Sequence, residues 1–429
     1  MMDGDYPEAL QIEVTNRCNF NCQMCVRRIW NTTLVDLNLD LYKKLASTFK
    51  HLKRLILYGL GEPFVNPSFI EMLKIAKENL PKDSEIIVST NGSLLNPILS
   101  EKILKIGVDN ISFSIDTADM SKLKYIREGS EPSALLSNFR HIARMKRLNK
   151  NSFKLGIEAV IMKSNFMDLP NLIEETARED VDYILVSHVV PYTRDMFSNS
   201  MYITISKKPL EIVKSILPYG RRIILDSIYE ELGRIYGVKS EFGVSKIISE
   251  FWKEAEKTGY WINLPLLFES IDKITAIEEI EKIFNLSQKI AYEYGVNLSL
   301  PNLYPDAKDR KCPYVDKNTV FIRSDGMVTP CSEFAYKHSV YINTHVKILN
   351  PVILGNLKTE NIIDIWNKEI YVNFREIRRR ISDNIPWCGD CPYSTSKCFF
   401  TETNSMDCYI NEPGCNECLY SVNLAQCNI

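Results

Sequence analysis

Three cysteines lie within eight positions near the start of the chain, in the segment QIEVTNRCNFNCQMCVRRIW of residues 11–30. Their spacing is Cys18-x3-Cys22-x2-Cys25, and they follow a β-branched run that predicts a strand. A [4Fe–4S] cluster normally takes four cysteine thiolates. Three thiolates in one loop would therefore leave one iron open to a substrate or cofactor. A structural zinc site would need a fourth ligand nearby, and the nearest histidine in sequence is His51.

Nine further cysteines lie between residues 312 and 427, and none lies between residues 26 and 311. In a reducing cytoplasm such groups indicate metal or redox chemistry rather than disulfides. Because the chain has only five histidines, iron–sulfur clusters are favoured over zinc sites, although the two CxxC pairs alone would also fit zinc ribbons. The nine are Cys312, Cys331, Cys388, Cys391, Cys398, Cys408, Cys415, Cys418 and Cys427.

Alternating strands and helices must position the first three cysteines. Six short β-branched runs alternate with amphipathic helical segments, which predicts an α/β fold with a parallel sheet. The predicted strands are residues 9–15, 54–60, 85–90, 110–116, 154–161 and 181–188. Six such units fit an open or partial barrel, and a doubly wound sheet would give the same pattern. In both folds the loops after the strands gather at one edge, where active sites lie.

The rest of the chain differs in character. Residues 201–295 are helical and amphipathic, which predicts a helical insertion, and residues 296–301 predict a seventh strand. The segment VFIRSDGMVTP, residues 320–330, predicts a hairpin with Asp325-Gly326 at its turn. We therefore expect three domains, at residues 1–200, 201–305 and 306–429.

Composition sets limits on the class of protein. The formal net charge of −2 gives no general attraction to nucleic acid or to acidic membranes. The first residues, MMDGDYPEAL, lack the basic and apolar regions of a signal peptide, and no apolar run is long enough to span a bilayer. We therefore expect a cytoplasmic enzyme or binding protein.

The spacing of Cys18, Cys22 and Cys25 resembles the signature of the radical S-adenosylmethionine (radical SAM) family, and the likeness extends over residues 9–190. The resemblance implies a partial (βα)6 barrel. It also implies that the open iron chelates S-adenosylmethionine, and that an electron cleaves this cofactor to a 5′-deoxyadenosyl radical. The electron would come from a low-potential donor of the ferredoxin or flavodoxin type.

The family's other motifs find counterparts at the ends of successive strands. Gly59-Leu60-Gly61-Glu62-Pro63 is similar to the loop that holds the methionyl amino group, and Thr90-Asn91-Gly92 to a turn that follows the third strand. Arg127 matches an arginine that pairs with the methionyl carboxylate. His188 and Tyr192 follow the sixth strand and are candidates for proton transfer or substrate contact. By this resemblance the cofactor-binding residues are Met24, Gly59, Gly61, Glu62, Pro63, Thr90, Asn91, Ser114, Asp116, Arg127 and His188.

The cysteine pattern after residue 306 resembles the SPASM extension of radical SAM enzymes. That extension typically holds two auxiliary [4Fe–4S] clusters, which would need eight thiolates, so one of the nine is in excess. The spacing does not assign the cysteines to clusters. The clusters would transfer electrons, bind substrate, or staple a loop-rich segment.

Three segments resemble the maturases associated with tungsten-containing aldehyde oxidoreductases: residues 24–30, 187–196 and 407–427. That resemblance implies modification of a tungsten-pterin cofactor or of its host enzyme, with Arg27, Arg28 and Trp30 as possible contacts for an anionic pterin. Two alternatives remain open. One is a SPASM enzyme that modifies a ribosomal peptide, and the other is a non-catalytic iron–sulfur or zinc protein.

Overall fold

The computed structural model describes residues 6–148, 153–215, 222–223, 225–226, 229–230 and 243–429. Its main feature is a ten-stranded sheet with the order β12-β9-β8-β1-β2-β3-β4-β5-β6-β7. The strands β1 to β7 are mutually parallel and adjacent in chain order. They are β1 (Ala9–Ile12), β2 (Arg54–Ile56), β3 (Glu85–Thr90), β4 (Asn110–Ser114), β5 (Lys154–Ile161), β6 (Tyr183–His188) and β7 (Asn297–Ser299).

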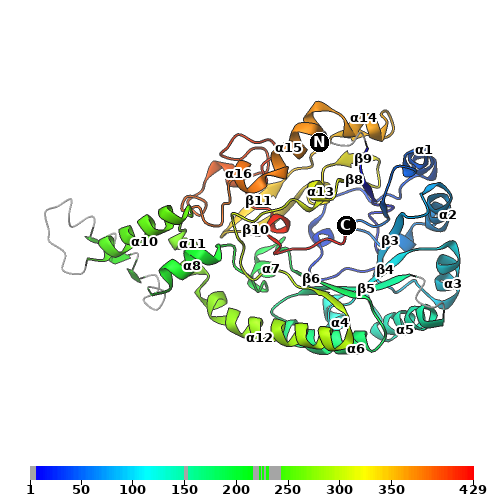
Figure 1. Ribbon diagram of the computed structural model, residues 1–429, viewed down its shortest axis with the longest axis horizontal. Coiled ribbons are helices and arrows are strands. Elements are labelled where there is room, and N and C mark those ends of the chain that lie inside the picture. Colours follow the sequence, from blue (N-terminus) through cyan, green and yellow to red (C-terminus); the bar gives the residue numbers. More distant parts are fainter. Residues whose placement is uncertain (1–5, 149–152, 216–221, 224, 227–228, 231–242) are drawn as a thin grey trace.

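The sequential strand order answers the question that the sequence pattern left open. A doubly wound sheet reverses direction at a switch point, and this sheet does not. It curves instead into an open barrel with helices outside (Figure 1). The partial barrel is therefore confirmed, as are all seven predicted strands.

The outer helices bury one apolar stripe each against the sheet. In α1 (Leu39–Phe49) the buried residues Leu41, Leu45 and Phe49 recur at helical spacing. Asn38 caps this helix by accepting hydrogen bonds from the N–H groups of the first turn. The other helices of this layer are α2 (Phe69–Asn79), α3 (Pro97–Ile106), α4 (Met120–Ile126), α5 (Pro132–Leu148), α6 (Leu169–Ala177) and α12 (Ile271–Tyr294).

The predicted helical region divides into two parts. The helices α8 (Lys207–Val213), α10 (Val244–Thr258) and α11 (Leu264–Glu269) share a small apolar core and project from the barrel (Figure 1). In contrast, α12 packs on α6, and β7 pairs with β6. The end of this region is therefore part of the barrel wall. Among the helices described, none is long and apolar enough to cross a membrane.

The cysteine-rich region begins by extending the barrel sheet. The strands β8 (Thr319–Ile322) and β9 (Met327–Thr329) form the predicted hairpin, and β8 pairs in parallel with β1. Gly326 occupies the turn at φ +90°, which a side chain would strain. The remaining elements are α7 (Arg194–Ser198), α13 (Pro313–Asp316), β10 (His338–Ile342), β11 (His345–Leu349), β12 (Gly355–Asn356), α14 (Ile362–Trp366), α15 (Glu369–Arg379) and α16 (Ile381–Asn384).

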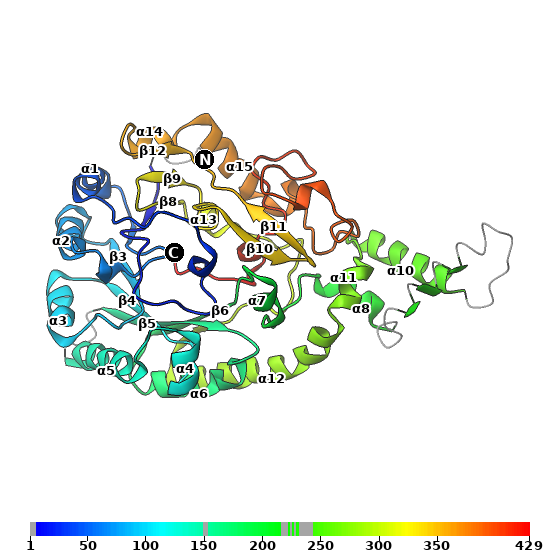
Figure 2. The same cartoon turned by 180° about the vertical axis from the view of Figure 1, so that it is seen from behind.

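The last residues of the chain enter the barrel. Figure 2 shows this red segment within the ring of strands, as does Figure 1. The Gln426 N–H donates to Ser187 Oγ at 3.0 Å, and Asn428 Nδ2 donates to Glu158 Oε1 at 2.9 Å. Lys317 donates to the Ile429 carbonyl, and Ile429 is buried. The interior of the barrel is thus partly filled by its own chain.

Candidate active site

A cavity of about 310 Å³ opens at the carboxyl ends of the barrel strands. Most of the residues that the sequence singled out line it. They are Cys18, Cys22, Met24, Cys25, Gly59, Gly61, Glu62, Thr90, Asn91, Ser114, Arg127, His188 and Tyr192. The structure therefore brings together residues from the ends of five separate strands. Two residues that were predicted to bind the cofactor, Pro63 and Asp116, do not line the cavity.

The cysteine loop is held in shape by two arginines. Arg27 Nε donates to the Asn16 carbonyl at 3.1 Å, and Arg28 Nη1 lies 2.6 Å from a Glu128 carboxylate oxygen. Trp30 packs on Tyr336, with ring centroids 4.6 Å apart. These three side chains brace the loop, and their expected contact with an anionic pterin stays a prediction.

Burial governs the chemistry of the three thiols. Burial raises the pKa of Cys22 to about 12, and it also raises the pKa values of Cys18 and Cys25. Buried thiols of this kind become thiolates when they ligate a metal, whose charge replaces the lost solvation. The Asn91 amide lies 3.7 Å from Cys18 Sγ, where it donates a weak hydrogen bond to the sulfur. The three residues fit a group of metal ions that faces the cavity.

Glu62 joins two of the loops at the cavity. Its Oε1 accepts from Thr90 Oγ1 at 2.7 Å, and its Oε2 accepts from the Asn91 N–H at 2.7 Å. Burial raises the pKa of Glu62 to about 7, although these hydrogen bonds oppose the rise. Pro63 is buried and starts the short 3-10 turn that follows. A cation bound beside Glu62 would restore its ionised form.

The glycines of the same loop are required by close packing. A Cβ on Gly61 would lie 2.3 Å from the Thr15 carbonyl oxygen, in the backbone that leads into the cysteine loop. A Cβ on Gly59 would lie 2.5 Å from the Glu13 side chain. The position between the two glycines does not require glycine and is occupied by Leu60. Only glycine therefore lets this loop approach the first strand so closely.

Arg127 and Asp116 form a buried, forked ion pair. Arg127 Nε lies 2.7 Å from Asp116 Oδ2, and Arg127 Nη2 donates to Oδ1 at 2.9 Å. The Val160 N–H also donates to Oδ1. Both carboxylate oxygens are thus engaged, so Asp116 orients Arg127 and does not itself reach the cavity. Asp116 is thus not among the residues that line the cavity, although it was expected to bind the cofactor, whereas Ser114 does line the cavity.

His188 borders the cavity through its backbone. Along β6 the side chains alternate, and Leu185 and Ser187 face the cavity. The His188 ring lies against Tyr202 and against Phe284 of α12, and its Nε2 is 3.0 Å from the Asn302 carbonyl oxygen. Burial lowers its pKa to about 3. The ring is therefore neutral at physiological pH and packs toward α12, and its expected role in proton transfer or substrate contact stays a prediction.

Several lining residues were not singled out from the sequence. Glu158 faces the cavity from β5, and its signal was a carboxylate within an otherwise apolar strand. Tyr58 lies at the end of β2. Tyr420 and Gln426 come from the far end of the chain, and no local pattern marks them.

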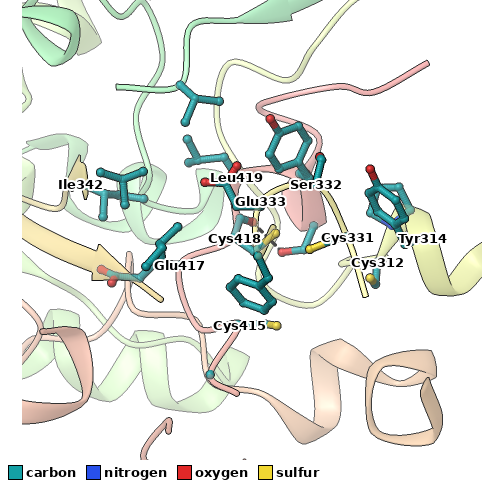
Figure 3. Close-up of a pocket in the computed structure, with 18 of the residues that line it drawn as sticks. Cys312, Tyr314, Cys331, Ser332, Glu333, Ile342, Cys415, Glu417, Cys418 and Leu419 are labelled. Atoms are coloured by element: carbon teal, nitrogen blue, oxygen red, sulfur yellow. Dashed lines mark hydrogen bonds between the residues drawn. The ribbon is translucent and has the colours of Figure 1, made fainter. Parts of the chain in front are cut away.

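A second cavity is lined by four of the nine later cysteines: Cys312, Cys331, Cys415 and Cys418 (Figure 3). Arg378 Nε donates to Cys415 Sγ at 3.2 Å. Within the described residues, no three histidine, cysteine or carboxylate side chains converge as the ligands of a single metal ion do. The four thiols instead surround a space, which is the arrangement that a multi-iron cluster requires.

Four other cysteines lie close enough to influence one another's charge: Cys388, which is buried, Cys391, Cys398, and Cys408, which is exposed. Burial raises the pKa of Cys391, and the neighbouring Cys398 and Asp390 add to the rise. Burial likewise raises the pKa of Cys408, with contributions from Asp407, Cys391 and Cys398. Asn416 Nδ2 donates to Cys388 Sγ at 3.0 Å. The ninth cysteine, Cys427, lies in the segment within the barrel and packs against the same apolar cluster as Cys312 and Cys331.

Comparison with known proteins agrees with this arrangement. Residues 12–184 match the Radical SAM superfamily, and residues 312–392 match the SPASM iron–sulfur cluster-binding domain. The chain is therefore a radical SAM enzyme with a SPASM domain, of the class that cleaves S-adenosylmethionine reductively. It is 26% identical to the tungsten-containing aldehyde ferredoxin oxidoreductase cofactor-modifying protein of Pyrococcus furiosus, over 98% of this chain and 97% of that protein.

Other similarities are partial. A GTP 3′,8-cyclase of Clostridium perfringens is 26% identical over 57% of this chain and 74% of its own length. The crystal structure of Streptococcus suis SuiB bound to S-adenosylmethionine superposes with a TM-score of 0.51 at 12% identity, covering 87% of this chain and 68% of that one. That likeness concerns the fold alone. The predicted family, fold and enzyme class are confirmed.

Proposed function

We propose that this enzyme matures a tungsten-containing oxidoreductase by modifying its pterin cofactor or the host enzyme. The observation that carries the proposal is the full-length similarity to a tungsten oxidoreductase cofactor-modifying protein, which includes the cysteine-rich region. The cavity beside the three cysteines supports it, because a small molecule or a protruding side chain fits there.

In the proposed site Cys18, Cys22 and Cys25 hold a [4Fe–4S] cluster. When bound, this cluster supplies the electron that splits S-adenosylmethionine into methionine and a 5′-deoxyadenosyl radical, which abstracts a hydrogen atom from the substrate. A small protein of the ferredoxin or flavodoxin type is the proposed electron source.

The chain's own residues position the cofactor. Glu62 and the carbonyl groups beside Gly59 and Gly61 would accept hydrogen bonds from its ammonium group. Arg127, oriented by Asp116, would pair with its carboxylate. The Met24 thioether would pack on the adenine ring, and the Ser114 hydroxyl would hydrogen-bond to the ribose.

The nine later cysteines divide into two auxiliary cluster sites and one free thiol. One site takes Cys312, Cys331, Cys415 and Cys418, which share the second cavity. The other takes Cys388, Cys391, Cys398 and Cys408. Buried Arg378 and Arg310 offset the negative charge of the first site, since Arg378 bonds a sulfur and Arg310 Nη2 donates to the Cys415 carbonyl at 3.1 Å. Cys427 is the cysteine in excess.

The metal assignment is tested on protein reconstituted without oxygen. The wild-type chain should hold about twelve irons, and Cys22→Ala should hold about eight, because each cluster contains four. Cys22→Ala should also form no 5′-deoxyadenosine. Cys427→Ala is the matched control and should keep all of its iron. A loss of about four irons from Cys427→Ala would contradict the division of the nine cysteines.

The substrate is tested by the yield of 5′-deoxyadenosine. With reductant and S-adenosylmethionine present, the unmatured tungsten oxidoreductase or its isolated cofactor should raise the yield above the basal level. The unmatured tungsten oxidoreductase should also gain enzymatic activity during this reaction. Stimulation by a peptide, with none from the tungsten enzyme, would favour the peptide-modifying alternative. The sheet offers such a peptide little edge, since β7 has three residues and β12 has two.

A further inference from the structure

A buried carboxylate ties the first strand to two distant parts of the chain. Glu13 follows β1, is fully buried, and does not line the cavity. Its Oε1 accepts from the Leu60 N–H at 3.0 Å, in the centre of the Gly59–Glu62 loop. Its Oε2 accepts from the Ser324 N–H at 3.2 Å and from Ser324 Oγ at 3.0 Å. The Tyr336 hydroxyl donates to the same oxygen.

The two oxygens of Glu13 therefore face two different partners. One faces the proposed cofactor loop, and the other faces the turn of the β8–β9 hairpin and the segment after it, both in the SPASM domain. No Lys or Arg pairs with this carboxylate within the described residues, so these four donors stabilise its charge. Loss of one donor alters the hydrogen bonds that the others make.

Close packing transmits any shift of Glu13 to the loop. A Cβ on Gly59 would meet the Glu13 side chain at 2.5 Å, so the loop backbone lies directly on this carboxylate. Tyr336 also packs on Trp30, which follows the cysteine loop. One tyrosine of the SPASM domain thus supports both the cofactor loop, through Glu13, and the end of the cysteine loop.

We propose that Glu13 is a positioning residue through which Ser324 and Tyr336 of the SPASM domain set the affinity for the amino-acid end of S-adenosylmethionine. This proposal rests on the proposed role of the Gly59–Glu62 loop. The cysteine-rich region then does more than hold auxiliary clusters, because it completes the cofactor site of the barrel from behind.

The test compares two ligands on the reconstituted holoenzyme without turnover. S-adenosylmethionine carries the amino-acid end, and 5′-methylthioadenosine lacks it. Tyr336→Phe removes one hydroxyl and keeps the ring against Trp30. We expect its Kd for S-adenosylmethionine to rise about five- to tenfold, which is less than the full effect of losing a hydrogen bond to a charged group because Tyr336 acts on the cofactor loop through Glu13. The Kd for 5′-methylthioadenosine and the iron content should not change.

Tyr304→Phe is the matched control. It removes a tyrosine–glutamate hydrogen bond of 2.5 Å, between Tyr304 and Glu281, outside the site. Both Kd values should equal those of the wild type. Ser324→Ala removes a second donor to Glu13 and should act in the same direction as Tyr336→Phe, which provides an independent variant if the latter folds poorly.

The outcomes separate the two proposals. An unchanged Kd for S-adenosylmethionine in both Tyr336→Phe and Ser324→Ala would overturn the role of Glu13. Equal weakening of both ligands would overturn it as well, because that indicates general damage to the site. Failure of the wild-type protein to bind S-adenosylmethionine would instead contradict the proposed function itself.

Discussion

Glu62 shows how one side chain connects the two loops that would surround a bound ammonium group. In the ligand-free chain, burial raises the pKa of Glu62 to about 7, above its ordinary value of 4.5. Between these two pH values the folded protein retains a proton that the unfolded chain has lost. Ionisation of Glu62 therefore lowers the stability of the ligand-free protein as the pH rises from 4.5 to about 7. A bound cation removes this cost.

The affinity for S-adenosylmethionine should consequently depend on pH through Glu62. Below pH 7 the Glu62 carboxyl is protonated and must ionise before it can pair with the ammonium group. The Kd should therefore rise by up to about tenfold for each unit by which the pH falls below 7. Glu62→Gln should bind more weakly and lose this dependence. Calorimetric titration from pH 5.5 to 8 measures the affinity of each protein and its dependence on pH. Because the amino group of the cofactor titrates equally in both experiments, the profile of Glu62→Gln serves as the reference for that contribution. Parallel profiles for the two proteins would show that another group is responsible.

Individual residues also show the limit of motif matching. The sequence placed Asp116 and His188 at the correct strand ends, and the structure gives their side chains other partners. Asp116 forms an ion pair with Arg127. The His188 side chain points toward α12 because successive side chains along β6 point to opposite faces of the sheet. A motif fixes where a residue lies along the chain. The direction of its side chain depends on strand register and on helices that pack from far away in sequence.

At the scale of elements, the loop after β2 can pack as it does only because Gly59 and Gly61 have no side chains. Gly61→Ala would place a methyl group 2.3 Å from the Thr15 carbonyl oxygen, and neither backbone segment can move freely. We expect the affinity for S-adenosylmethionine to fall at least about tenfold and the unfolding free energy to fall by about 1 to 3 kcal/mol. Ligand binding and denaturant unfolding measure the two effects.

The control for this variant is a glycine in open space. Gly295 ends α12 at φ +70° and has no atom within 4 Å of the position of a Cβ. Gly295→Ala strains the backbone by about 1 kcal/mol, and it should leave cofactor affinity unchanged. If both variants weaken binding equally, close packing of the Gly61 loop is not the reason for its glycine.

The elements themselves were well predicted because each carries a local signal. Strands such as β3 are buried on both faces and read as continuous apolar runs, and the β8–β9 hairpin carries its Asp-Gly turn. The pairing of β8 with β1, about three hundred residues apart, has no such signal. For the same reason the contacts of Glu13 with Ser324 and Tyr336 were not anticipated.

At the scale of the whole molecule, residues 424–429 join the cysteine-rich region to the interior of the barrel. Ile429 is 3% exposed among apolar residues of β1, β2 and β8. Ile429→Ala should lower the unfolding free energy by about 2 to 5 kcal/mol, as for other buried isoleucines. Ile98→Ala, at a site 81% exposed, should have almost no effect. Denaturant unfolding followed by tryptophan fluorescence compares them, and equal stability would show that this segment does not pack in the barrel.

This packing has a consequence for how the protein is made. The ribosome completes Cys25 about 400 residues before Gln426, which corresponds to roughly 20 to 80 seconds of synthesis. The strands β2 to β7 are synthesised within that interval, and until it ends they lack the segment that later fills the interior of the barrel. The three N-terminal cysteines are therefore synthesised well before residues 424–429. The order of translation completes the cysteine loop before Gln426, which lines the same cavity, has been made.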